Sequence, residues 1–119
     1  MVAAAVWILT FAVIAGVVLA LWHLRATEAA SRPPLFAGIA HGVIGTAGLV
    51  LLVIALRGPP RAVEAGAGSF GPTAAVLFAA AVLIGIVLLF ARQKAVLISI
   101  HAGLAVTGYV LLLAWDSLG

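Results

Sequence analysis

Three histidines are the side chains in this sequence with the clearest capacity for chemistry. His41 and His101 each lie just inside a long apolar stretch, and His23 lies at the end of another. The chain has no cysteine, which excludes thiolate metal sites, iron–sulfur clusters and covalently attached c-type haem. A polar group inside a membrane is costly and generally faces the interior of a helix bundle. His41 and His101 are therefore the candidate metal ligands.

The composition places these histidines in a membrane protein. Of the 119 residues, 66% are hydrophobic and 8% are charged, whereas soluble domains are about 45–50% apolar and about 25% charged. The mean hydropathy is +1.38. A helix needs about 20 apolar residues to cross a bilayer, and four stretches meet that length: about residues 2–24, 35–56, 72–91 and 95–115.

The predicted fold is all-α: a polytopic membrane protein with an up-down bundle of four transmembrane helices. Residues 1–119 then form a single membrane domain with little extramembrane structure. The long connection over residues 57–71 is rich in Gly, Pro and Ala. We expect it to be a mobile surface loop.

Basic residues at the ends of the spans predict the orientation. The net charge is +3, but the basic residues lie in short loops and form no continuous patch, so we expect no nucleic-acid partner. Two connections on one side of the bilayer carry Arg25, Arg32, Arg92 and Lys94, and the other side carries Arg57 and Arg61. By the positive-inside rule, we expect a bacterial inner-membrane protein with both termini outside the cytoplasm.

The two halves of the sequence resemble each other. The stretch AHGVIGTAGLVLLV at residues 40–53 aligns with IHAGLAVTGYVLLL at residues 100–113, and the alignment pairs His41 with His101. The preceding helices align more weakly. This pattern predicts a duplicated helical hairpin with a pseudo-two-fold axis along the membrane normal. The two copies cover about residues 1–56 and 72–115.

The depths of the histidines predict a common layer. At about 1.5 Å per residue, His41 and His101 lie about 8–9 Å inside helices that run in the same direction. Gly16 and Gly85 lie about 9–12 Å from the ends of the helices that run the other way. Two imidazoles and two glycines therefore alternate around one level of the bundle. Such a layer suits a haem, which takes an axial ligand on each side of its iron and needs small neighbours at its edges.

Other residues near this layer complete the candidate cofactor site. Gly45 and Gly48 share a helix face with His41, and Gly108 shares one with His101, at spacings of four or seven residues. Haem propionates require cationic partners at the membrane rim. The candidates for that role are His23, Arg25, Arg92 and Lys94.

With these residues in place, the chain resembles the four-helix haem-binding core of b-type membrane cytochromes, in which histidines of the second and fourth helices ligate haem. The resemblance implies a haem b held by His41 and His101. Such cores commonly hold two haems, with two histidines on each of these helices, whereas this chain has one per helix. At most one bis-histidine haem therefore fits, near one face. A bacteriochlorophyll held by a single histidine is the alternative cofactor.

Other functions stay open. A histidine near a helix end can simply hydrogen-bond a carbonyl, and Gly in membrane helices often marks close packing. The alternative function is a cofactor-free accessory or structural subunit of a larger respiratory or photosynthetic complex. Proton-coupled multidrug transport is disfavoured, because all three carboxylates lie outside the spans. We expect the chain not to be an enzyme by itself. The expected partners are the lipid bilayer and either other membrane subunits or further copies of the chain.

Overall fold

The computed structural model describes residues 1–28, 32–90 and 94–119, and this described part is all-helical. Its helices are α1 (Val2–Arg25), α2 (Leu35–Ala55), α3 (Phe70–Phe90) and α4 (Ala95–Ser117). Each is long and apolar enough to cross a membrane. The predicted four-helix fold is therefore confirmed, and the limits of the helices agree with the predicted spans to within two residues.

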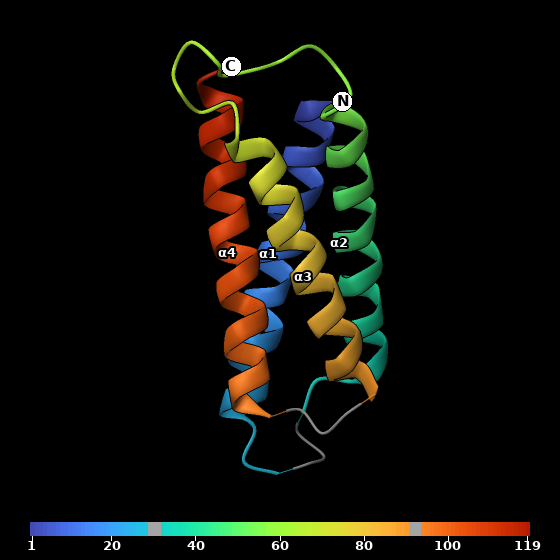
Figure 1. Ribbon diagram of the computed structural model, residues 1–119. Coiled ribbons are helices and arrows are strands. Elements are labelled where there is room, and N and C mark those ends of the chain that lie inside the picture. Colours follow the sequence, from blue (N-terminus) through green and yellow to red (C-terminus); the bar gives the residue numbers. More distant parts are fainter. Residues whose placement is uncertain (29–31, 91–93) are drawn as a thin grey trace.

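The helices alternate in direction around one axis. Figure 1 shows both chain termini at the same end of the bundle, where α2 ends and α3 begins. Helices α1 and α2 pack side by side as one hairpin, and α3 and α4 pack as the other. The two hairpins contact each other through α2 with α3 and through α4 with α1. Within the described residues, no Cα atoms of the diagonal pairs α1–α3 and α2–α4 approach within 8 Å. Helices α2 and α4 therefore face each other across the bundle axis.

Local sequence sets two of the helix ends. Pro34 is the N-cap of α2 and has extended dihedral angles of −69° and 149°. Proline cannot donate a backbone hydrogen bond, and the residue before a proline is driven out of the helical region. At the end of α1, His23 and Arg25 occupy the last turn, where positive charge interacts favourably with the helix dipole.

Side-chain packing differs between the two ends of the bundle. We call one part the packed half, which comprises residues 2–12, 45–55, 70–81 and 105–117. The other part is the histidine half, which comprises residues 13–25, 35–44, 82–90 and 95–104. Every buried helical residue in the described part lies in the packed half, and Leu9, Leu52 and Leu112 are its largest fully buried side chains. The histidine half contains only partly buried and exposed residues among those described.

The buried positions follow the same order in the two hairpins. In α2 they are Gly48, Leu52 and Ala55, and in α4 they are the aligned residues Gly108, Leu112 and Trp115. Helices α1 and α3 likewise share buried positions at the aligned pairs Ala5 and Ala74, Leu9 and Phe78, and Ala12 and Ala81. This likeness supports the duplication, which stays a prediction.

The connection between α2 and α3 lies mostly at the surface, as expected, but two of its alanines pack on the bundle, which the sequence did not predict. Ala62 and Ala67 are 5% and 2% exposed and belong to the hydrophobic core. The amide of Ala67 donates a hydrogen bond to the carbonyl of Ala62 at 2.9 Å. The segment therefore closes the packed half from its end, and Gly71 belongs to α3 rather than to the loop.

Candidate functional site

His41 of α2 and His101 of α4 meet across the bundle axis. Their ring centroids are 5.9 Å apart, and the ring planes are inclined by 79° in an edge-to-face arrangement. Both side chains are partly buried. Because α2 and α4 are diagonal helices, the two imidazoles span the interior of the histidine half. The structure thus brings together the two candidate ligands.

A glycine on the preceding helix makes room for each imidazole. A Cβ atom on Gly16 would lie 2.8 Å from Cε1 of His41, and one on Gly85 would lie 3.2 Å from Cε1 of His101. These distances are shorter than ordinary van der Waals contacts. The four residues therefore share one layer, and the two glycines face the imidazole rings themselves.

The His101 ring is oriented by the backbone of α3. Its Nδ1 atom lies 2.7 Å from the carbonyl oxygen of Ala81. A carbonyl only accepts hydrogen bonds, so Nδ1 carries the proton, and in the neutral ring the lone pair lies on Nε2. Metal-ligating histidines are typically held in this way. The Nδ1 atom of His41 is buried, and none of the described residues hydrogen-bonds it.

The remaining candidate glycines lie at contacts between helices. A Cβ on Gly48 would approach Leu9 of α1 to 2.7 Å, and one on Gly108 would lie 3.2 Å from Leu77 of α3. A Cβ on Gly45 would lie 4.0 Å from the Cβ of Ala12. These three glycines lie where helices pack against each other, and their role in binding a cofactor stays a prediction.

The candidate basic residues that the structure describes lie at the end of the bundle nearest the imidazoles. His23 and Arg25 are in the last turn of α1, and Lys94 is the N-cap of α4. Arg25 and Lys94 are exposed, whereas Nδ1 of His23 is buried without a hydrogen-bond partner among the described residues. Arg92 lies outside the described residues.

The donor set restricts what metal the site can hold. Among the described residues, no group of three or more His, Cys, Asp or Glu side chains is placed to bind a metal ion. A metal at this site would thus have two imidazole ligands and would take the rest from a cofactor. The ring centroids of His41 and His101 are 5.9 Å apart, so these two side chains are the candidates to hold such a cofactor together.

One feature of the site has no signature in the sequence, whereas a polar contact in the packed half has a partial one. The carbonyl of Ala81 orients His101, but every residue has a backbone carbonyl. The hydroxyl of Tyr109 lies 2.6 Å from Oγ1 of Thr10. Thr10 itself donates to the carbonyl of Val6 at 2.7 Å, so Tyr109 is the donor in the bond that joins α4 to α1. Polar residues within predicted spans were the signal for this pair.

Comparison of the chain with known protein families, with curated proteins and with solved structures found no match.

Proposed function

We propose that this chain is a single-haem, b-type cytochrome-like membrane protein or subunit that takes part in electron transfer. The observation that carries the proposal is the meeting of His41 and His101 at 5.9 Å between diagonal helices. His41 and His101 would hold the haem. The bond from Nδ1 of His101 to the carbonyl of Ala81 leaves Nε2 as the ring atom that would bind the iron.

Packing around the pair supports this assignment. In the histidine half, no described residue is fully buried, and the neighbours that His41 and His101 have on α1 and α3 are the glycines Gly16 and Gly85, which leave no bulky side chain beside the two candidate ligands. The basic side chains at the rim of this half suit propionate groups. Haem would supply a one-electron change of its iron. The chain would hold the ring, orient its ligands and keep water away with apolar helices.

The number of histidines limits the role of the chain. It has three histidines, and one pair accounts for both axial ligands of one haem. That pair lies toward one end of the bundle. Electron transfer across the whole membrane would therefore need a second redox centre on a partner, which agrees with a role as a subunit.

One observation favours the alternative of a cofactor-free accessory subunit. The two imidazole rings already contact each other, and each fills the space above a glycine. Histidines that serve only for packing would have this arrangement.

An absorption spectrum separates the two functions. The full chain, purified from haem-replete cells, should show a Soret band and a sharp reduced α-band after addition of dithionite, because two imidazoles make the iron low-spin. Haem extraction should give about one haem per chain. A well-folded preparation without a Soret band would contradict the cytochrome proposal and leave the accessory subunit as the better account.

A further inference from the structure

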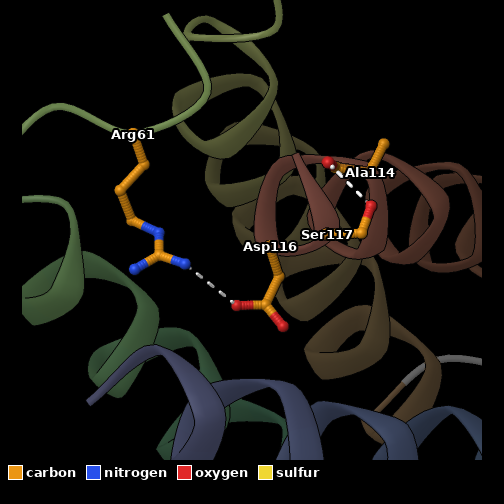
Figure 2. Close-up of polar contacts among 4 residues, drawn as sticks. All are labelled: Arg61, Ala114, Asp116 and Ser117. Atoms are coloured by element: carbon orange, nitrogen blue, oxygen red, sulfur yellow. Dashed lines mark hydrogen bonds and ion pairs between the residues drawn. The ribbon is translucent and has the colours of Figure 1, made fainter. Parts of the chain in front are cut away.

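The end of the packed half carries a guanidinium group with unused hydrogen-bonding capacity. Arg61 lies in the connection between α2 and α3, with its guanidinium 5.7 Å from the centre of the Trp115 ring. Its Nη2 atom lies 3.5 Å from Oδ1 of Asp116 (Figure 2). This ion pair is long and about one-third exposed on each side, so it is weak.

The rest of the guanidinium has no anionic partner in the described part of the chain. The Nε atom of Arg61 makes no hydrogen bond there, but it is buried, so the nitrogen left for a ligand is the second terminal one. Figure 2 shows the second terminal nitrogen pointing away from Asp116. A guanidinium offers several N–H donors in a planar fork, and that geometry suits a phosphate.

A groove beside Arg61 is open to a phosphate group. It has a volume of about 310 Å³ and lies between the start of α1 and the end of α2, with Met1, Val2, Ile54 and Arg61 among its lining residues. The first turn of α1, beside the groove, has no acidic residue that would compete with a phosphate for Arg61.

We propose that this groove binds a membrane phospholipid, with the lipid phosphate on Arg61 and an acyl chain against the apolar wall. The position supports a lipid rather than a soluble anion. The ends of spanning helices lie at the level of the lipid headgroups, and Met1 and Ile54 expose 65% and 42% of their surface beside the charge. Asp116 holds one nitrogen of Arg61 and so competes with the phosphate for it.

The test is lipid binding by the full chain in detergent, followed by native mass spectrometry during titration with phosphatidylglycerol. One lipid should bind per chain, and Arg61→Gln should weaken this binding about tenfold through loss of a charge-assisted contact. The control variant is Arg57→Gln, since Arg57 is exposed and does not line the groove. It should leave the affinity unchanged.

Asp116→Asn distinguishes a lipid site from a purely structural ion pair. Because this change removes the charge of Asp116 that competes for Arg61, lipid affinity should rise about threefold, which corresponds to the energy of an exposed ion pair. If the ion pair only fastens the loop, both variants should lower thermal stability and neither should change lipid affinity. That result would overturn the proposal.

Two further probes identify the source of the phosphate. Diacylglycerol with the same acyl chains should bind much more weakly, and inorganic phosphate at millimolar concentration should not displace the lipid. Equal binding of diacylglycerol would show an apolar crevice only, and displacement by inorganic phosphate would show a site for soluble anions. Either outcome would contradict the lipid site.

Discussion

Each imidazole in the histidine half occupies space that is free only because the residue beside it on the neighbouring helix is a glycine. His41 lies over Gly16, and His101 lies over Gly85. Both hairpins have the same pairing of a histidine with a glycine on the preceding helix, so the two candidate ligands are packed in the same way. A larger side chain at either glycine would push the ring out of the layer.

Under the proposed function, substitution of these glycines should lower haem binding without changing a candidate ligand. Gly16→Leu or Gly85→Leu should lower haem occupancy about tenfold, since overpacking costs about 1–3 kcal/mol. Gly103→Leu is the matched control, because a Cβ at Gly103 meets nothing within 4 Å. It should bind haem like the parent chain when measured by Soret absorbance per chain. Equal occupancy in all three variants would contradict the role of the glycines.

Much of this layer was predictable from residue depth. Helical rise places Gly16, Gly85 and the two histidines at one level, and the structure brings them together. The contact partner of each glycine was not predictable, since depth along an axis does not fix rotation around it. For the same reason, Gly48 shares a face with His41 in sequence but packs on Leu9 in the structure.

At the scale of the helices, the described contacts between α1 and α4 include one polar link. The Tyr109 hydroxyl donates to Thr10 across this interface. The aligned positions in α2 and α3 are Leu49 and Ala79, whose apolar side chains cannot form such a hydrogen bond. The two interfaces between the hairpins therefore differ, since the α1–α4 interface has the Tyr109 hydrogen bond and the α2–α3 interface has no equivalent at the aligned positions.

Tyr109→Phe should reduce the free energy of unfolding by about 1 kcal/mol, which is typical of a hydrogen bond between membrane helices. The measurement is unfolding in mixed micelles with increasing SDS. Thr46→Val is the control, since the Thr46 hydroxyl bonds only to the carbonyl of Gly42 in its own helix. A loss as large for Thr46→Val as for Tyr109→Phe would argue against an interhelical role.

The sequence predicted the elements better than the connection between them. Long apolar runs fixed the spans to within two residues because crossing a bilayer requires a certain length. The packing of Ala62 and Ala67 into the core went unpredicted. Alanine in a stretch rich in Gly and Pro shows no hydrophobic periodicity, so its burial depends on tertiary contacts alone.

At the scale of the whole molecule, charge and shape together predict the orientation in the membrane. Both termini and the loop between α2 and α3 lie at one end of the bundle (Figure 1). The exposed Arg25 and Lys94 lie at the other end, beside the histidine half. The positive-inside rule therefore predicts that the histidine half faces the cytoplasm.

Single cysteines test this orientation cleanly, because the chain has none of its own. Cysteine at Thr27 should be protected from a membrane-impermeant thiol reagent in intact cells, and cysteine at Ala65 should be labelled. Both residues are exposed, so burial does not confuse the result. Labelling at Thr27 with protection at Ala65 would invert the orientation and place the histidine half at the outer face.

Under the proposed function, His41 and His101 together hold one haem, and the reduced spectrum of three variants beside the parent chain is the most direct measurement of this. His41→Ala and His101→Ala should each abolish the low-spin α-band or convert it to a high-spin spectrum, since either change opens an axial position of the iron. His23→Ala should keep the band, because His23 lies at the rim. A parent chain with no α-band, or an α-band that survives the loss of either His41 or His101, would contradict the account.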